Sequence, residues 1–128
     1  MKRIAFIDLG SNSVRFVIYE ISKTGSYRLI YQEKNSVRLS ENMWGTQKLT
    51  NEAMERSLRS LKAFVHMAEA MDVDTIKAVA TAAVRLAKNG DIFIKTVKEQ
   101  TGLDLECIAG EEEARLGFLG VINTFGLK

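Results

Sequence analysis

The sequence predicts an α/β fold built on a mixed five-stranded sheet, with its elements in the order βββαβαβα. Three observations lead to this prediction. The first third of the chain has three apolar or alternating segments separated by short polar turns, which is typical of antiparallel strands. A long amphipathic segment follows, and strand-like and helix-like segments alternate after it. A hairpin start followed by alternating units favours a mixed sheet covered by helices.

Three strands joined by two polar turns are expected at the start of the chain. The strands are residues 4–9, 14–21 and 27–39, and the turns are residues 10–13 and 22–26. Nearly all residues of the first strand are apolar, so we expect it to be buried. In the third strand, the alternation of side chains predicts that Tyr27, Leu29 and Tyr31 share one face.

Helices and strands alternate in the rest of the chain. Thr50 is expected to cap the first helix, and Asp72 and Asp74 mark its end. Its apolar stripe is Met54, Leu58, Leu61, Val65 and Ala68. The later strands are residues 75–81 and 103–108, and the later helices are residues 82–87, 91–101 and 110–123. Gly102 suits the left-handed position after a helix.

Composition excludes several classes of protein. The 128 residues suffice for one domain, and 46% hydrophobic and 27% charged residues are close to the globular average. One cysteine cannot build a disulfide framework, and no segment has the roughly 20 apolar residues of a membrane helix. A net charge of +2 does not favour nucleic acid or an anionic membrane as a partner. Because no secretory signal is recognisable, we expect a cytoplasmic protein.

The first polar turn is a candidate anion-binding site. Asp8 ends an otherwise apolar strand, where a carboxylate should face a cleft, a metal or a donor. Gly10 allows close approach of the backbone to a ligand, and Arg15 can bind phosphate through two N–H groups. The donors between them are Ser11, Asn12 and Ser13. The spacing alone favours the simpler interpretation, a polar hairpin turn with a capping aspartate.

Two helix starts carry further candidates. Thr81 lies between a strand and a helix, where unpaired N–H groups favour anions, and Arg85 follows one turn later. The alternative is an ordinary capping threonine and a surface arginine. Residues 111–113 place three glutamates in the first turn of the last helix. They could merely stabilise the helix, but Glu113, if partly desolvated, could act as a general base.

Taken together, the three motifs resemble the family of exopolyphosphatases and guanosine pentaphosphate phosphohydrolases (Ppx/GppA). The matching segments are Asp-Leu-Gly-Ser-Asn-Ser-Val-Arg at 8–15, Val-Ala-Thr-Ala-Ala-Val-Arg at 79–85 with Asn89 and Gly90, and Gly-Glu-Glu-Glu-Ala-Arg-Leu at 110–116 with residues 119–121. They follow the order of the family and span nearly the whole chain. The resemblance implies a ribonuclease-H-like lobe of the actin-like ATPase superfamily.

The resemblance also implies an activity, which is the Mg²⁺-dependent hydrolysis of a terminal phosphoanhydride of inorganic polyphosphate or guanosine pentaphosphate. Glu113 then matches the base that activates water, and Asp8 matches an acid near the metal. The residues expected to bind substrate phosphate are Gly10, Ser11, Asn12, Ser13, Arg15, Thr81 and Arg85. The alternatives are a lobe that binds phosphate or nucleotide without turnover and a kinase-type phosphotransferase lobe.

One element of the family pattern is missing. Such proteins carry a second glycine-rich phosphate loop with metal-binding acids shortly after the last predicted helix. We therefore expect residues 1–128 to be a single domain, the N-terminal lobe of a two-lobed core cut before that loop. The isolated chain should then be inactive or weak, and its partner is the C-terminal lobe. Unpaired sheet edges leave a homodimer open.

Three conspicuous residues are expected to carry no chemistry. His66 is assigned a structural or solvent-facing role, because no second metal ligand is near it in sequence. Cys107 is expected to be a buried small hydrophobe in its strand. Trp44 is expected to cover the sheet edge rather than to touch substrate.

Overall fold

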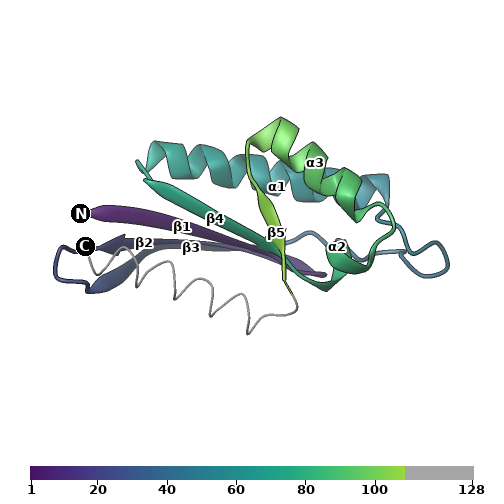
Figure 1. Cartoon of the computed structure of the whole chain (residues 1–128), viewed down its shortest axis with the longest axis horizontal. Coiled ribbons are helices and arrows are strands. Elements are labelled where there is room, and N and C mark those ends of the chain that lie inside the picture. Colours follow the sequence, from purple (N-terminus) through teal and green to yellow (C-terminus); the bar gives the residue numbers. More distant parts are fainter. Residues whose placement is uncertain (109–128) are drawn as a thin grey trace.

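The computed structural model describes residues 1–108, which form one mixed sheet with three helices (Figure 1). The strands are β1 (Lys2–Leu9), β2 (Ser13–Ile21), β3 (Tyr27–Ser36), β4 (Thr75–Ala80) and β5 (Leu105–Cys107). The helices are α1 (Asn51–Ala70), α2 (Ala82–Leu86) and α3 (Gly90–Thr101). The predicted order of elements is confirmed as far as β5, and the predicted helix at 110–123 lies outside the described residues.

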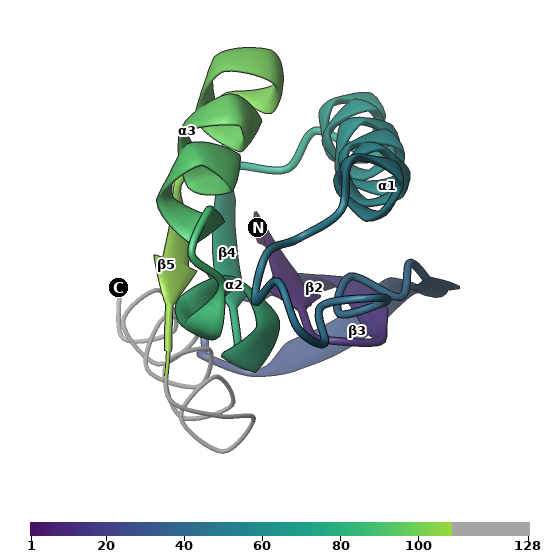
Figure 2. The same ribbon diagram turned by 90° about the vertical axis from the view of Figure 1, so that its right-hand side faces the viewer.

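The sheet has the strand order β3-β2-β1-β4-β5. Two hairpins make the β1–β2 and β2–β3 pairs antiparallel, whereas helical crossovers make β1–β4 and β4–β5 parallel. The predicted mixed sheet is therefore confirmed, and β1 lies at its centre. Seen from the end, α1 and α3 lie on the same side of the sheet (Figure 2).

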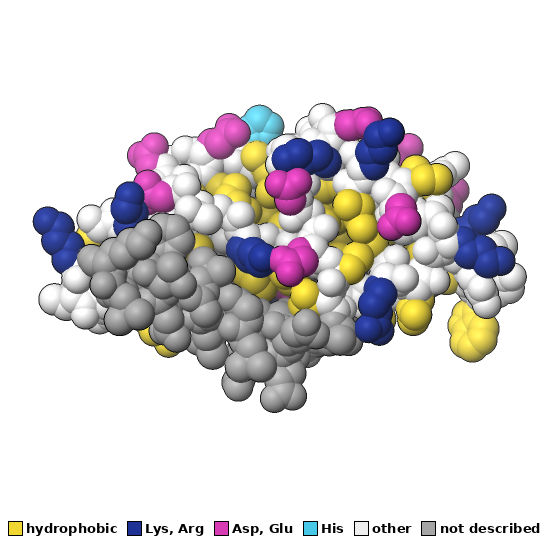
Figure 3. Space-filling model, in the orientation of Figure 1, with side chains coloured by type: hydrophobic (Ala, Val, Ile, Leu, Met, Phe, Trp, Pro, Cys, Tyr) yellow, Lys and Arg dark blue, Asp and Glu magenta, His cyan; other side chains and the backbone are white. Residues whose placement is uncertain are grey.

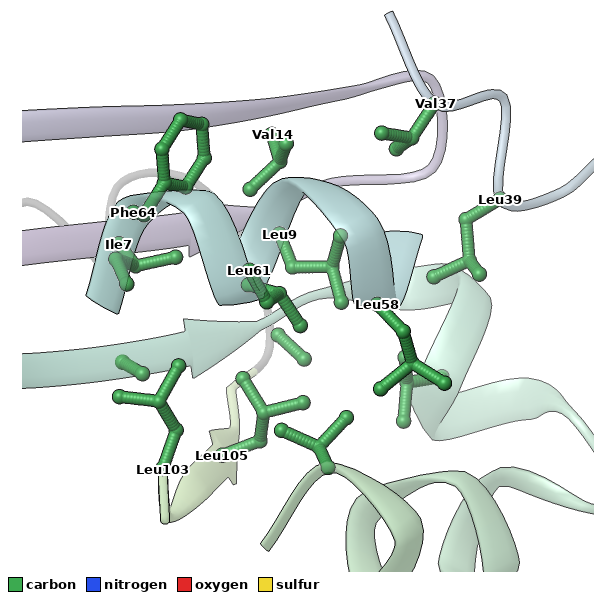
Figure 4. Close-up of a cluster of buried hydrophobic side chains, with 14 of the residues drawn as sticks. Ile7, Leu9, Val14, Val37, Leu39, Leu58, Leu61, Phe64, Leu103 and Leu105 are labelled. Atoms are coloured by element: carbon green, nitrogen blue, oxygen red, sulfur yellow. The ribbon is translucent and has the colours of Figure 1, made fainter. Parts of the chain in front are cut away.

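The main core lies between the sheet and these two helices. Ile7 and Leu9 of β1 are fully buried, as are Leu61 of α1 and Phe93 of α3. Phe64 stacks on Phe16 of β2 with ring centroids 4.7 Å apart, and Figure 4 shows Phe64 and Leu61 on the helix that passes in front of the strands. Each such side chain contributes about 1.5–3 kcal/mol when it leaves water, so the sheet-facing side of α1 is held firmly.

A second apolar cluster lies on the opposite face of the sheet. Ile4, Phe6, Val17, Ile21 and Val79 belong to it, together with Ile108. Side chains alternate between the two faces of a strand, so Asp8 follows Ile4 and Phe6 onto this face. The acidic residue therefore points away from α1 and α3.

The third strand differs from its prediction in its length and in the side of the sheet on which Tyr31 lies. The register shifts opposite Ile18 and Tyr19, so that Ile30 is an extra residue between Leu29 and Tyr31. Such a bulge reverses the alternation. Tyr31 consequently packs edge-on against Phe16 in the main core, at 5.8 Å, instead of sharing the face of Tyr27, which packs against Tyr19.

The same strand ends at Ser36 instead of Leu39. The apolar character of Val37 and Leu39 suggested more strand, and both residues are indeed buried. Arg38 between them has a left-handed φ of 47°, which turns the chain out of the sheet toward the β1–β2 turn. Val37 and Leu39 both belong to the main core, so their burial comes from side-chain packing rather than from strand pairing (Figure 4).

The first helix begins as predicted. The Thr50 side chain accepts a hydrogen bond from Ala53 N at 3.1 Å. The most buried positions of the helix are Ala53, Ser57, Leu58, Leu61, Phe64 and Ala68. Met54 and Val65, which were predicted within the apolar stripe, lie at its margin and are only partly buried. The stripe is rotated toward Phe64, whose ring fills the space above β2.

The remaining boundaries differ by one or two residues. Thr81 follows β4 instead of ending it, α3 begins at Gly90, and β5 is only Leu105–Cys107. Gly102 has φ 81°, the left-handed conformation predicted for it. No helix in residues 1–108 is both long and apolar enough to span a bilayer.

Two of the three conspicuous residues are placed differently from the predictions, while His66 is exposed on α1 as expected. Trp44 is 97% exposed and does not cover the sheet edge, since it lies in the loop that extends away from the sheet at the right of Figure 1. Cys107 is exposed rather than buried. It shares a face with Leu105, but β5 is short and lies at the edge of the described sheet, so only Leu105 is covered.

Candidate active site

The carboxyl ends of β1 and β4 bring the first two motifs together. The strands are parallel and in register up to the pair Leu9 and Ala80. Just beyond, Thr81 N donates to Leu9 O at 3.0 Å, which ties the start of α2 to the end of β1. In Figure 2 the β1–β2 turn and α2 lie at the end of the sheet that faces the viewer. Residues about 70 positions apart in sequence thus form one local site.

Gly10 leaves open the space between these two elements. A Cβ at this position would lie 3.2 Å from Ser13 O and 3.9 Å from Thr81 Oγ1. Gly10 N also donates to Ser13 O at 2.9 Å, which closes the turn. A Cβ would press on Ser13 O but would make only ordinary contact with Thr81, so glycine suits the tight turn at this point.

Asp8 and Arg15 are directly opposite each other in the β1–β2 hairpin. Directly paired residues have Cβ atoms about 4.5–5.5 Å apart and share a face, so an acid and a base lie side by side next to the turn. Arg15 is exposed, whereas Asp8 is partly buried and its Oδ1 atom is fully buried. The pair therefore combines a partly buried carboxylate with an exposed guanidinium that is accessible to a ligand.

The turn is braced by a segment that no motif singled out. Asn12 O accepts hydrogen bonds from Val37 N at 3.0 Å and from Arg38 N at 2.8 Å, and Ser11 O accepts one from Ser40 N at 3.0 Å. These three hydrogen bonds attach the Ser11 and Asn12 carbonyl groups to residues 37–40, which restrains the shape of the turn. The only sequence signal for this contact is the pair of apolar residues Val37 and Leu39, whose pattern predicts strand.

Thr81 occupies the capping position of α2 but does not cap it. Its side chain makes no hydrogen bond to the helix, and Oγ1 instead lies 3.5 Å from Leu9 O. Thr81 is only 8% exposed, and α2 has five residues. So short a helix has a small dipole, and the expected role of Thr81 in anion binding depends on its place beside Gly10 rather than on the helix.

Arg85 lies one turn after Thr81 and faces solvent near β5. Partial removal of the Cys107 thiol from water raises its pKa most, and the charge of Asp91 also raises it, whereas the charge of Arg85 lowers it. The net result is a pKa above the usual value. Arg85 is therefore close to the end of β5, where the described part of the chain stops.

Asn89 and Gly90, the other residues of the second motif, hold the elements around the site. The Asn89 side chain accepts a hydrogen bond from Leu49 N at 2.8 Å and donates one to Leu49 O at 3.0 Å, which joins α3 to the start of α1. A Cβ on Gly90 would lie 2.1 Å from Val84 O of α2. Gly90 therefore allows α2 and α3 to meet at a distance that any other residue would prevent.

Comparison with known proteins identifies the family to which this arrangement belongs. Residues 17–128 match the model of the Ppx/GppA phosphatase family. The chain belongs to the Ppx/GppA phosphatase family. It is 45% identical over 122 residues to a guanosine-5'-triphosphate,3'-diphosphate pyrophosphatase of Pseudoalteromonas atlantica, a match that covers 94% of this chain and 24% of that protein.

Solved structures of Ppx/GppA proteins share the fold. The Aquifex aeolicus family member is 35% identical and superposes with a TM-score of 0.85, over 94% of this chain and 39% of that one. An exopolyphosphatase from Cytophaga hutchinsonii is 33% identical with a TM-score of 0.83, over 94% and 38%. The fold class inferred from the motifs is thereby confirmed. The chain spans about a quarter of the curated relative and less than two-fifths of these two structures.

One predicted Ppx/GppA site residue lies outside the described part. Glu113, the expected base, comes after residue 108, where the described residues end. Within residues 1–108, no group of three or more His, Cys, Asp or Glu residues could hold a metal ion. The described residues therefore offer a polar turn beside the paired Asp8 and Arg15, and not a complete metal centre.

Proposed function

We propose that this chain forms the N-terminal lobe of a phosphoanhydride hydrolase that removes the terminal phosphate of inorganic polyphosphate or guanosine pentaphosphate. The observation that carries the proposal is the junction of β1 and β4, where Gly10 and Thr81 lie beside the paired Asp8 and Arg15. Family membership supports the reaction class, and the activities named for the relatives support the two substrates.

In this proposal the turn at residues 10–13 receives the terminal phosphate. Its carbonyl groups at Ser11 and Asn12 are already engaged by residues 37–40, so the hydroxyl, amide and N–H groups are the ones left to face an anion. Arg15 adds a charged, two-pronged donor from the neighbouring strand, and Thr81 adds a hydroxyl from the far side of Gly10. Arg85 would approach the phosphate chain from the β5 side.

Asp8 fits a magnesium ion that is shared with the substrate. Mg²⁺ commonly binds proteins through one or two carboxylates together with substrate phosphates and water, and Asp8 would supply one such carboxylate beside the turn. When bound, the ion supplies neutralisation of the negative charge that develops on phosphate oxygens. The partly buried position of Asp8 would keep its carboxylate directed at the turn.

Glu113 is the proposed base. A carboxylate placed directly against a polyphosphate would repel it, so the base has to act through an intervening water molecule, which it orients and deprotonates. The attacking water would then be aligned with the terminal phosphorus held in the turn. The C-terminal lobe, the proposed partner of this chain, would supply the second phosphate loop. A homodimer remains a further proposal.

The test is phosphate release by the full-length protein carrying this sequence, with Mg²⁺ and each of the two substrates. Glu113→Ala should lower turnover at least about a hundredfold with the fold intact, the size expected for loss of a general base. Glu112→Ala is the matched control, because the adjacent residue points about 100° away around a helix. The 128-residue chain alone should be inactive or weak.

The outcomes separate the alternatives. Phosphate or nucleotide binding without turnover by the full-length protein would support a non-catalytic lobe. Transfer of phosphate to an acceptor other than water would support a kinase-type lobe. Near-normal phosphate release by Glu113→Ala would refute the assignment of the base, and equal release from both substrates by the wild type would leave a hydrolase of broad substrate range.

A further inference from the structure

Arg56 of α1 reaches the segment that braces the phosphate turn. Its Nε atom donates to Val37 O at 2.9 Å, and its Nη2 atom donates to Arg38 O at 3.3 Å. Nη2 also pairs with Glu41 Oε2 at 2.5 Å. The Arg56 side chain is 21% exposed, and its hydrogen bonds to Val37 O and Glu41 are partly buried.

One peptide group links Arg56 directly to the turn. The peptide between Val37 and Arg38 presents its carbonyl oxygen to Arg56 Nε and its N–H to Asn12 O, at 2.9 and 2.8 Å. The preceding N–H, of Val37, also donates to Asn12 O. The guanidinium of Arg56 is thus connected to Asn12 of the turn through the hydrogen bonds of this one peptide group.

The backbone conformation at Arg38 shows why such a hold is needed. Its φ of 47° is unfavourable for a residue with a side chain, and it persists only where the surroundings fix it. Arg56 binds the carbonyl on each side of the Arg38 Cα atom, which restrains both of its backbone angles. This conformation turns the chain after Arg38, so that Ser40 N in the following turn donates to Ser11 O at 3.0 Å.

We infer that Arg56 is a positioning residue for the phosphate turn, acting through the backbone of Val37 and Arg38. The inference rests on the proposed function only for its consequence in turnover. The planar guanidinium serves two carbonyls and a carboxylate at once, whereas a lysine ammonium is a single point charge on a flexible stem. Arg56→Lys therefore keeps the charge and the helix but loses the fixed geometry.

The first measurement is hydrogen exchange in the full-length protein. Arg56→Lys and Arg56→Ala should speed exchange of the Val37, Arg38 and Ser40 amides at least about tenfold, while the amides of α1 keep their wild-type rates. Arg59→Ala is the matched control, since Arg59 lies on the same helix and is exposed. Rates in Arg56→Lys within about twofold of those in Arg59→Ala would overturn the inference.

The second measurement separates positioning from general stability. In phosphate release at a temperature where all variants are folded, Arg56→Lys should raise KM at least about fivefold and change kcat less, because a displaced turn weakens binding of the phosphate in ground and transition states alike. An unchanged KM would overturn the inference. If the wild type hydrolyses neither substrate, the proposed function fails, and the exchange rates alone still decide whether Arg56 holds the turn.

Discussion

Replacement of Gly90 by alanine tests whether the meeting of α2 and α3 depends on the missing side chain. The added Cβ would lie 2.1 Å from Val84 O, more than 1 Å closer than ordinary contact at 3.4 Å. The obstacle is a backbone carbonyl, which cannot rotate away like the end of a flexible side chain. Either α2 or α3 has to move, and both belong to the main core through Val84 and Phe93.

Two effects of opposite sign decide the magnitude. Glycine to alanine within a helix gains up to about 1 kcal/mol from backbone entropy. Overpacking costs about 1–3 kcal/mol and occasionally more, and a backbone clash of this depth should be at the upper end. We therefore expect Gly90→Ala to lower the free energy of unfolding by about 2 kcal/mol, as measured by urea denaturation. Amide exchange should also rise for Arg85 N and Ala87 N, whose hydrogen bonds lie within α2.

Gly102→Ala is the matched control. Gly102 has φ 81°, and no neighbouring atom lies within 4 Å of the place where a Cβ would stand, so alanine there meets backbone strain without a clash. It should cost about 1–2 kcal/mol and leave exchange in α2 unchanged. A Gly90→Ala protein that is as stable as the wild type or more stable would show that helix propensity outweighs the contact, and the reasoning would be refuted.

Two titration experiments test the remaining electrostatics. Hydrogen bonds from Arg28 and then Arg3 lower the pKa of Glu20 from its usual 4.5, so this group adds stability above that value and loses it as the pH falls through the lowered pKa. The stability advantage of wild type over Glu20→Gln in urea unfolding should shrink from about pH 6 to about pH 3, and a constant difference would contradict this. For Cys107, burial and Asp91 raise the pKa above its usual 9.0 while Arg85 lowers it, so the pH profile of alkylation should have its midpoint above 9.0. Arg85→Gln should move that midpoint upward, and a downward move would show that Arg85 does not lie near the thiol.

Local patterns are sufficient to predict the order of the elements and the two motifs at the strand ends. The capping threonine at residue 50 depends on neighbours in sequence, and it is found as predicted. The meeting of Gly10 with Thr81 follows from the parallel pairing of β1 and β4, and the order of elements alone does not specify which strand pairs with β4.

The errors come from contacts between distant residues. The bulge at Ile30 reverses the facing of Tyr31, and no local signal distinguishes it from a regular strand. Val37 and Leu39 resemble strand because both are apolar, yet they are buried beside a left-handed residue that binds the turn. Cys107 lies in an apolar strand, which predicts burial, but burial depends on whether a helix covers that position.

The two sides of the proposed site are held by separate contacts. The β1–β2 turn depends on residues 37–40 and through them on Arg56, whereas α2 depends on Gly90 and on the bond from Thr81 N to Leu9 O. The surface charge cannot by itself attract a polyanion strongly. Acidic and basic side chains are interspersed on the face shown in Figure 3, and the net charge is only +2. Affinity for a polyanion would therefore depend on a few donors in fixed positions rather than on a basic surface. Loosening the turn should then weaken phosphate binding even when α2 is intact, and moving α2 should displace Thr81 even when the turn keeps its shape.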